Sequence, residues 1–228
     1  VDDTAIAMIK DFLHNFDSAL EEMAKLLHGN RIFIERLEGI GVLPKETAIA
    51  YGVTGPSLRA SGVEYDIRRA KPYLQYNEID FKIPTYTEAD CLARYYIRGD
   101  EVKESVKIIK QILDKMPAGE IMANDPKKVL PKKGEIYSRM EELIHDFMII
   151  NHGVNPPVGD VYFSAENPKG ELGFYLVSNG TGHPWKLKIR SPSFCNLQVL
   201  PLLCKGHMIS DVVAIIGSLD PVMGEADK

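Results

Sequence analysis

The chain contains 228 residues, with a formal net charge of -5 and 45% hydrophobic residues, values that are ordinary for a globular protein with a sizeable core. The acidic balance gives no sign of general nucleic-acid binding, and the longest apolar run, residues 212–217, is far too short to span a membrane. The cysteines are widely separated and form no CxxC pair, which indicates a reducing compartment and argues against a disulfide framework, a zinc knuckle or a cysteine-ligated cluster; they are Cys91, Cys195 and Cys204.

The N-terminal part of the chain is predicted to be helical. Apolar residues at alternating steps of three and four predict one long amphipathic helix, with Gly29 as its C-terminal cap and His14 and His28 solvated, off its apolar seam. Shorter helices are expected over residues 31–38 and 45–51. The apolar seam of the first helix consists of Ile6, Ile9, Leu13, Phe16, Leu20, Met23 and Leu27.

A stretch rich in glycine, residues 52–62, surrounds a lone Arg59. Its glycines and proline predict a tight, exposed loop. The spacing matches neither the GxGxxG pattern nor a phosphate loop that continues into Gly-Lys-Ser/Thr. Two interpretations stay open: a structural turn, or a stiff loop that holds Arg59 for a function.

Two further helices are predicted in the middle of the chain. Residues 87–90 have the form of a capping box and open a helix that runs to Met116, where Pro117 stops it. A polar loop over residues 118–133 leads to another helix over residues 135–151. The buried stripe expected on the first of these helices consists of Leu92, Val102, Val106, Ile109, Leu113 and Met116.

The clearest β signal lies in the last third of the chain. Strands are expected over residues 160–165 and 172–177, the second followed by an Asn-Gly turn. Further on, Lys186, Lys188 and Arg190 alternate with apolar residues, so one face of this strand is basic. That face is either solvated or shaped to meet a partner or an anionic group.

Helices return over residues 194–205, interrupted by Pro201, and over residues 208–216. The predicted fold class is therefore α+β, mainly α, with a small antiparallel sheet near the C-terminus. The chain opens at Val1 directly into a helix, so we expect it to be part of a longer protein. We expect a single domain over residues 1–228, with a helical core over 1–155, a small sheet over 156–193, and C-terminal helices and a tail over 194–228.

Little chemistry is visible from motifs. There is no HExxH, no nucleophile elbow, no glycine-rich nucleotide loop and no cysteine ligand set. Asp220, beside Pro221 and an apolar segment, is a candidate for a buried carboxyl group with a raised pKa that donates a proton. The alternative is an ordinary aspartate at a helix end or in a turn.

Several phrases of the sequence together resemble one family. In their order and position they are similar to the C-terminal part of the D-type subunit of NADH:quinone oxidoreductase, respiratory complex I, over essentially the whole chain. That subunit is in turn similar to the large subunit of nickel-iron hydrogenases. The phrases are Gly29-Asn30-Arg31-Ile32, Gly55-Pro56-Ser57-Leu58-Arg59-Ala60-Ser61-Gly62, Pro168-Lys169-Gly170-Glu171, Lys188-Ile189-Arg190-Ser191-Pro192-Ser193-Phe194, Gly206-His207-Met208 and Asp220-Pro221-Val222-Met223-Gly224-Glu225-Ala226-Asp227.

The resemblance implies a hydrogenase-large-subunit-like helical core and a role in the quinone-reduction chamber beside the terminal iron-sulfur cluster. Electron transfer from NADH to quinone would be coupled there to proton translocation. The resemblance implies that this chain binds no cofactor of its own, and that NAD and the iron-sulfur clusters lie in partner subunits. The implied partners are the B-type subunit, which bears the terminal cluster, the C-type subunit and the H-type subunit in the membrane. The implied location is peripheral, at the cytoplasmic face of a bacterial inner membrane or the matrix side in mitochondria.

The resemblance also implies site residues. Asp220 and Val222 match positions near the quinone chamber, whereas Lys169 and Arg190 match basic positions that face the cluster-bearing neighbour; no metal ligand is implied. The residues that hold the quinone headgroup in the family precede the matched region, so we expect an isolated chain to lack a complete site and to be inactive. The sequence departs from the family at Asn167, where alanine is usual, and at its last residue, a lysine in place of arginine.

Two other functions remain open beside quinone reduction. A hydrogenase catalytic subunit needs cysteine pairs for nickel and iron, one of them near the C-terminus, but no cysteine follows Cys204. A non-catalytic module that only docks neighbouring subunits is the second alternative.

Overall fold

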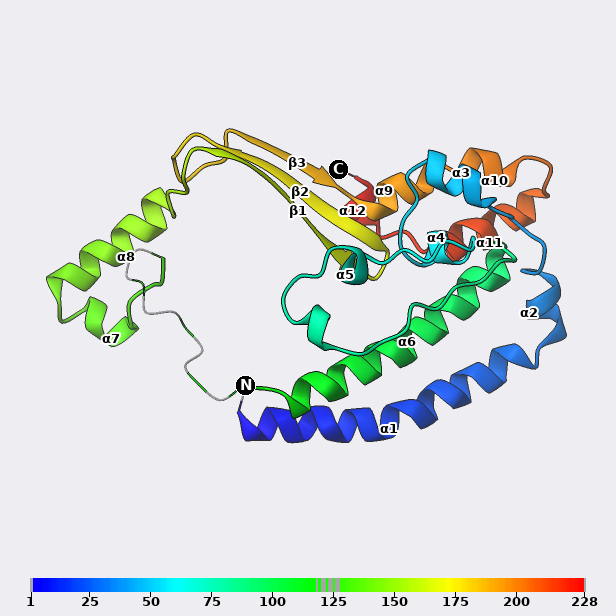
Figure 1. Ribbon diagram of the computed structural model, residues 1–228, viewed down its shortest axis with the longest axis horizontal. Helices are drawn as coiled ribbons and strands as arrows, with labels where there is room; N and C mark the ends of the chain where they lie inside the picture. Colours follow the sequence, from blue (N-terminus) through cyan, green and yellow to red (C-terminus); the bar gives the residue numbers. More distant parts are fainter. Residues whose placement is uncertain (1, 118, 120–121, 123–124, 126–127, 228) are drawn as a thin grey trace. The chain divides into compact units, whose positions relative to one another are not determined.

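The computed structural model describes residues 2–117, 119, 122, 125 and 128–227 (Figure 1). The chain divides into two compact units. The core unit comprises Val1–Met116, Ser164–Leu172 and Arg190–Lys228, and the hairpin unit comprises Pro117–Phe163 and Gly173–Ile189. The single domain expected from the sequence stays a prediction.

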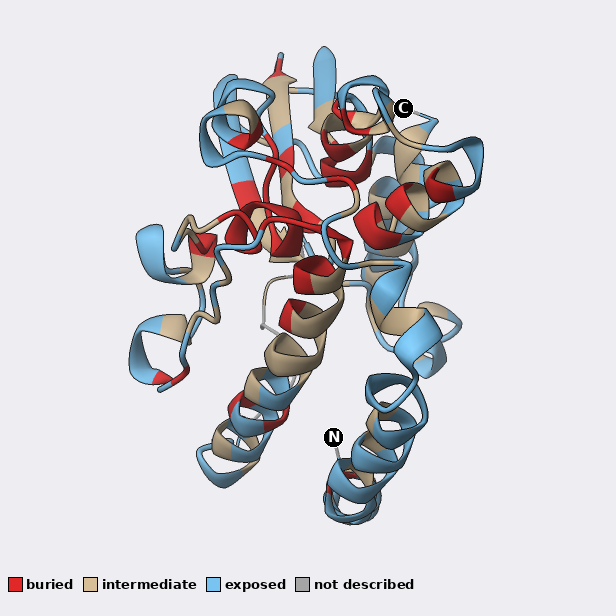
Figure 2. Cartoon of the chain, turned by 90° about the vertical axis from the view of Figure 1, so that its right-hand side faces the viewer, coloured by how far each residue is buried: buried red, intermediate tan, exposed pale blue. Residues whose placement is uncertain are grey.

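The long N-terminal helix is confirmed as α1, Asp3–His28. Asp2 caps its start by accepting a hydrogen bond from the backbone N–H of Ala5, and Gly29 forms its C-terminal cap. Its apolar seam is only partly covered, because Leu13 is the only buried residue of the helix and Met23 and Leu27 are exposed, and Figure 2 shows much of the helix at the N-terminus exposed. The next helix, α2, spans Arg31–Glu35 and is shorter than expected.

The glycine-rich loop is buried, so the prediction of an exposed loop is wrong. It follows α3, Lys45–Ala50, and contains the short helix α4, Pro56–Arg59. Gly55 has a positive φ of 73°, and a Cβ at this position would meet the Gly170 backbone at 2.5 Å. The loop is therefore glycine-rich because its backbone lies directly against the backbone of another segment.

The central helix α6 spans Cys91–Asp114 and begins later than the capping-box pattern predicted. The side chain of Asp90 caps it by accepting from the N–H of Ala93, and Ala89 before it has a left-handed φ of 60°. Only Val106 of the predicted stripe is buried, because the first half of the helix packs against α4 and α11 through a different face. The buried residues of α6 are Cys91, Ala93, Arg94, Ile97, Val106 and Ile108. Before it lie two short elements, α5, Ile67–Ala70, and a 3-10 turn, η1, Tyr76–Glu78.

The C-terminal helices complete the core of this unit. They are α9, Pro192–Leu197, α10, Leu200–Cys204, α11, Ile209–Leu219, and α12, Met223–Ala226, with Pro201 in the first turn of α10. The helices predicted around Pro201 and after Met208 are therefore confirmed. The main hydrophobic cluster consists of Leu43, Ala48, Val53, Leu58, Cys91, Val199, Leu203, Ile215 and Leu219.

The hairpin unit contains two helices and most of the sheet. The single helix expected over residues 135–151 is split into α7, Lys133–Ile136, and α8, Met140–His152, and α8 has no buried residue. Part of the polar loop expected over residues 118–133, namely 118, 120–121, 123–124 and 126–127, lies outside the described residues. The strands β1, Gly159–Asn167, β2, Gly170–Ser178, and β3, Lys186–Arg190, form one antiparallel sheet in the order β1-β2-β3. The predicted class, mainly α with a small antiparallel sheet, is confirmed. None of the helices in the described part of the chain is long and apolar enough to cross a membrane.

Candidate functional site

Asp220 lies at the end of α11 in a left-handed conformation, with φ 53° and ψ 55°. Its N–H donates to the carbonyl oxygens of Ile216 and Gly217 at 3.2 Å, which closes the helix. Its side chain is 42% exposed, so the expectation of a buried carboxyl group is wrong. The alternative expectation, an aspartate at a helix end, is confirmed.

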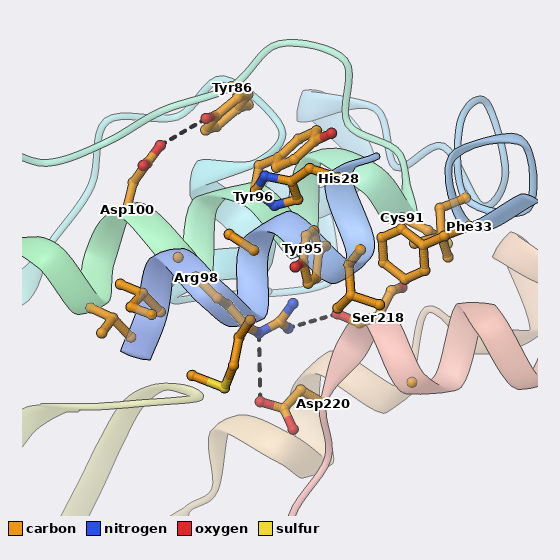
Figure 3. Close-up of a pocket in the computed structure, with 18 of the residues that line it drawn as sticks. His28, Phe33, Tyr86, Cys91, Tyr95, Tyr96, Arg98, Asp100, Ser218 and Asp220 are labelled. Atoms are coloured by element: carbon orange, nitrogen blue, oxygen red, sulfur yellow. Dashed lines mark hydrogen bonds and ion pairs between the residues drawn. The ribbon is translucent and has the colours of Figure 1, made fainter. Parts of the chain in front are cut away.

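Two cations flank the Asp220 carboxylate. The Lys169 ammonium group, from the turn between β1 and β2, contacts Oδ2 directly. Arg98 Nε, from α6, lies 3.5 Å from the same oxygen (Figure 3). Because Lys169 is only 19% exposed in this pairing, its charge is directed at Asp220 rather than at open solvent.

Arg98 is held in place by backbone carbonyl groups. Its Nη1 donates to the carbonyl oxygen of Arg94 and its Nη2 to that of Ser218, both at 2.6 Å. Its buried Nε makes no hydrogen bond within the described part of the chain. Burial lowers the pKa of Arg98, and the charge of Asp220 opposes this shift. Arg98 thus presents one buried N–H toward the Asp220 side of the site.

Arg94 fixes the relative position of α6 and α11. It is fully buried, and its Nε donates to the Ser218 hydroxyl at 3.0 Å, while Nη1 and Nη2 donate to the carbonyl oxygens of Ala89 at 2.9 Å and Gly41 at 2.8 Å. These bonds tie the last turn of α11, from which Asp220 follows, to the first turns of α6. The sequence analysis missed Arg94 and Arg98, since an arginine inside an amphipathic helix carries no signal of the side to which it points.

An apolar cavity of about 630 Å³ opens between α1, α2, α6 and α11, with Arg98 and Asp220 at one end (Figure 3). His28 lines it and is exposed, as expected from the sequence, while its ring packs edge-on against Tyr95 and Tyr96 with ring centroids 5.6 and 5.1 Å apart. The aromatic rings that line the cavity belong to His28, Phe33, Tyr86, Tyr95 and Tyr96.

Tyr86 is the cavity tyrosine with the strongest polar contact. Its hydroxyl donates to Asp100 Oδ2 at 2.7 Å. Burial and this hydrogen bond raise the pKa of Tyr86 to about 12. The phenol therefore stays protonated across the neutral range and is engaged by a carboxylate on the same cavity wall.

A second cavity, the polar cavity, has a volume of about 390 Å³ and is lined mainly by residues with charged or polar side chains. It shares Arg98, Val102 and Asp220 with the apolar cavity, so these residues form the boundary between the two. The charged residues that line it are Arg59, Arg68, Arg98, Glu101, Glu166, Lys169 and Asp220.

Arg59 is the centre of a buried ion cluster on this cavity. Its Nε donates to Glu101 Oε1 at 2.6 Å and its Nη1 to Glu166 Oε1 at 2.9 Å, while Asp66 Oδ2 lies 3.7 Å from Nη1. The Arg59 side chain is 2% exposed. The loop thus inserts Arg59 among carboxylates inside the molecule, and whether the loop holds Arg59 for a function stays a prediction.

The pKa values of two carboxyl groups around Arg59, Asp66 and Glu166, are shifted in opposite directions. Burial would raise the pKa of Asp66, but the hydrogen bonds and charge of Arg68, together with Arg59, hold it below the usual range. Burial also raises the pKa of Glu166, and here the opposing charge of Arg59 does not cancel the shift. Glu166 is thus the carboxyl group of the pair that binds a proton more readily.

The two remaining predicted residues, Arg190 and Val222, make hydrogen bonds to groups other than Asp220. Arg190 Nη1 donates to the carbonyl oxygen of Glu171 at 2.6 Å and Nη2 to that of Gly52 at 2.8 Å, so it ties strand ends to the buried loop. Val222 is 42% exposed, and its N–H donates to the Ser193 hydroxyl at 3.2 Å. The structure therefore brings Lys169 to Asp220 and leaves Arg190 in other contacts.

Within the described ranges, no group of three histidine, cysteine, aspartate or glutamate side chains is arranged to hold a metal ion.

The chain belongs to the family described as respiratory-chain NADH dehydrogenase, 49 Kd subunit, whose model matches residues 1–228. The resemblance drawn from its sequence phrases is confirmed.

Relatives of the chain are D-type subunits of NADH-quinone oxidoreductases. The protein from Chloroherpeton thalassium is 61% identical over 97% of this chain and 50% of its own length. Those from Salinibacter ruber and Opitutus terrae are each 54% identical, over 98% and 95% of this chain and 50% and 51% of their own lengths. The chain thus spans about half the length of these relatives.

Proposed function

We propose that this chain forms part of the quinone-reducing site of an NADH:quinone oxidoreductase that couples electron transfer from NADH to proton translocation. The observation that carries the proposal is the apolar, aromatic cavity with the Arg98–Asp220 pair at one end. Its volume of about 630 Å³ lies in the range of small-molecule sites, which are mostly apolar with a few polar groups. The relatives' name, NADH-quinone oxidoreductase, supports the same substrate.

The lining suits the chemistry of a quinone. An aromatic wall packs against a flat ring, and an apolar groove accepts a hydrocarbon tail. A quinone that takes up two electrons and two protons becomes a quinol, and negative charge develops on its carbonyl oxygens as the electrons arrive. A fixed cation close to that oxygen stabilises the charge, and Arg98, held by backbone carbonyl groups, has this role in our proposal.

Asp220 positions the cations of this site and contacts the quinone together with Val222. Its carboxylate pairs with Arg98 and Lys169 at the boundary between the two cavities. Asp220 would therefore fix the positions of the Arg98 and Lys169 charges relative to the quinone. Val222, two residues further on and partly exposed, would provide an apolar contact.

The proposed partners are the other subunits of the complex. A cluster-bearing B-type subunit would deliver electrons, and the C-type subunit and the H-type subunit in the membrane would complete the surroundings, with NAD and the iron-sulfur clusters bound outside this chain. The chain would lie peripherally at the cytoplasmic face of the inner membrane. We propose Lys169 and Arg190 for the interface with the cluster-bearing subunit, together with the exposed Lys186 and Lys188.

Asp220→Asn in the assembled complex tests the proposal. We expect quinone reduction by NADH to fall about tenfold or more, since one charge of the site is removed, while NADH oxidation by ferricyanide, which needs only upstream steps, is unchanged. The matched control is Asp227→Asn, on an exposed residue of the same tail. Unchanged quinone turnover in an assembled Asp220→Asn complex would remove Asp220 from the site.

A docking module without a catalytic role is the second candidate. The observation that favours it is the exposure of most apolar side chains of α8, a surface suited to a neighbouring subunit. A pure docking role predicts that the Asp220→Asn complex assembles and reduces quinone normally. The apolar side chains concerned are Met140, Leu143, Ile144, Phe147, Met148 and Ile150.

A further inference from the structure

We propose that the polar cavity beside Asp220 supplies protons to the quinone, and that Glu166 is the carboxyl group from which they leave. This inference rests on the proposed function. It adds a path for protons to the proposed function. Glu166 would pass protons to the quinone through water in the polar cavity and would not contact the quinone itself.

The two cavities meet at the proposed substrate. Arg98, Val102 and Asp220 line both, so a proton that crosses the polar cavity arrives beside the end of the apolar one. A volume of about 390 Å³ holds on the order of ten water molecules, and its charged walls offer them hydrogen-bond partners. Ser105 and Pro168 line this cavity and are exposed, so the cavity opens to solvent beside these residues.

Glu166 is the carboxyl group of the buried cluster that is best suited to exchange a proton. Asp66 is held by Arg68, with three hydrogen bonds from Arg68 Nε and Nη2 at 2.6–3.2 Å, and by Arg59, which keep it ionised. Glu101 is closer to solvent, with 17% of its side chain exposed, and pairs with Arg59 Nε at 2.6 Å.

Glu166 accepts only one side-chain hydrogen bond in the described structure, from Arg59 Nη1 to its Oε1, and is 6% exposed. The titratable groups that act on it are Arg59 from α4, Asp66 and Arg68 from α5 and its cap, and the phenols of Tyr65 and Tyr73. The Tyr73 hydroxyl accepts a hydrogen bond from the Glu166 backbone N–H at 3.1 Å. Its raised pKa agrees with the geometry, because one arginine shared among several carboxylates does not offset its burial.

The charge balance of the cavity wall favours the transfer. The wall carries four cations and three carboxyl groups, and Asp66, paired with Arg59 and Arg68, adds a fourth carboxyl group next to the wall, so a proton loaded on Glu166 leaves this group of charges net positive near the quinone. The positive potential favours the arrival of electrons on the substrate. The cations are Arg59, Arg68, Arg98 and Lys169, and the carboxyl groups are Asp66, Glu101, Glu166 and Asp220.

The step balances as follows. NADH, through the redox centres of the partner subunits, supplies two electrons to the quinone. A proton leaves the Glu166 carboxyl group, passes through water in the polar cavity and forms an O–H bond on a quinone carbonyl oxygen. Glu166 regains a proton from solvent, and a second transfer completes the quinol.

The test uses the assembled complex with Glu166→Gln and Glu166→Asp. The glutamine keeps an oxygen for the Arg59 hydrogen bond but carries no exchangeable carboxyl proton. We expect Glu166→Gln to slow quinone reduction by tenfold to about a hundredfold with little change in the KM for quinone. The wild-type rate falls as pH rises through the raised pKa of Glu166, and this limb of the pH profile is absent in Glu166→Gln. Glu166→Asp restores much of the rate and the pH dependence.

A second pair of variants addresses the route without altering the buried cluster. Ser105→Phe narrows the opening of the cavity, so we expect a several-fold slower rate with a larger solvent deuterium isotope effect, whereas Ser105→Ala behaves as wild type. Ferricyanide reduction stays unchanged in every variant.

Two results overturn the proton route. The first is a pH profile of quinone reduction that is unchanged in Glu166→Gln, or a rate that falls equally in Glu166→Gln and Glu166→Asp at every pH. Either observation indicates that Glu166 has a structural role alone. The other is a Ser105→Phe enzyme with the wild-type rate and isotope effect, which decides the matter if Glu166→Gln does not assemble. If Asp220→Asn slows quinone reduction while these variants do not, only the route is wrong; if Asp220→Asn is also without effect, the proposed function fails.

Discussion

Arg98 Nε of α6 lies 3.5 Å from the carboxylate of Asp220, although 122 positions separate the two residues in the sequence, 98 to 220. The pair stands where an apolar and a polar cavity meet. Its position depends on Arg94, which bonds to the Ser218 hydroxyl and so ties the end of α11 to α6. A redox substrate in the apolar cavity would meet the Arg98–Asp220 pair where the cavity borders the polar one, and the Asp100 carboxylate, held by Tyr86, elsewhere on the wall.

Lys169 and Arg190 are expected to contribute to the association with the cluster-bearing subunit. The double variant Lys169→Ala with Arg190→Ala should weaken co-purification of that subunit several-fold, because removal of charge near an interface reduces electrostatic complementarity. The loss should be larger at low salt, where the charges of the wild type are screened less. Lys10→Ala, on the exposed side of α1, is the control. Co-purification as strong as that of the wild type would count against the interface.

Arg59→Met should destabilise the chain strongly. Arg59 is 2% exposed and is the partner of Glu101 and Glu166, so its loss leaves buried carboxylates without a counter-charge. Breaking a buried pair by removing one partner costs about 3–5 kcal/mol, and the urea midpoint of unfolding should fall accordingly. Arg31→Met, which removes an exposed pair with Glu35, should leave the midpoint nearly unchanged. Equal midpoints for the two variants would contradict the prediction.

Asp66→Asn should change the dependence of stability on pH. The pKa of Asp66 in the folded chain lies below its ordinary value of 3.8, so its charge stabilises the fold above that pH, and the stabilisation is lost as pH falls through the folded pKa. The variant should therefore unfold more easily than wild type at pH 7, and the difference should narrow toward pH 3. Denaturant unfolding at both pH values measures this. Asp80→Asn, on a fully exposed side chain, should show no such trend.

Gly55→Ala should destabilise the chain more than Gly52→Ala. Both glycines have a positive φ, which costs alanine about 1–2 kcal/mol. At Gly55 the added Cβ would also meet the Gly170 backbone at 2.5 Å, whereas nothing lies within 4 Å at Gly52. Overpacking against backbone adds about 1–3 kcal/mol, so thermal unfolding should separate the two variants by several degrees. A smaller loss for Gly55→Ala would show that the two segments separate easily.

Local elements were predictable because local interactions form them. The first helix follows from its apolar spacing and from Gly29, and the sheet follows from β-branched and aromatic runs. The family was recognisable for a similar reason: its phrases are short and contiguous. Element bounds were less accurate, and α6 begins at Cys91 because Asp90, rather than the earlier threonine, caps it.

The candidate site was predictable only in part. Asp220 and Lys169 were named from the sequence, and the structure pairs them. Arg98 and Glu166 were missed, since a charged residue within a helix or strand has no sequence signal that distinguishes burial from exposure. The loop around Arg59 was expected to be exposed for the same reason. Glycine and proline indicate a turn, but they do not indicate whether another segment of the chain buries that turn.

The sequence by itself determined the secondary structure in outline, the mainly α class and the family, all of which depend on patterns among neighbouring residues. Only the tertiary structure decided which charges are paired and which face of each helix is buried. The physical reason is that burial and ionisation depend on partners within several ångströms. Those partners are distant in the chain: Glu166 lies 107 positions from Arg59, and Lys169 lies 51 from Asp220.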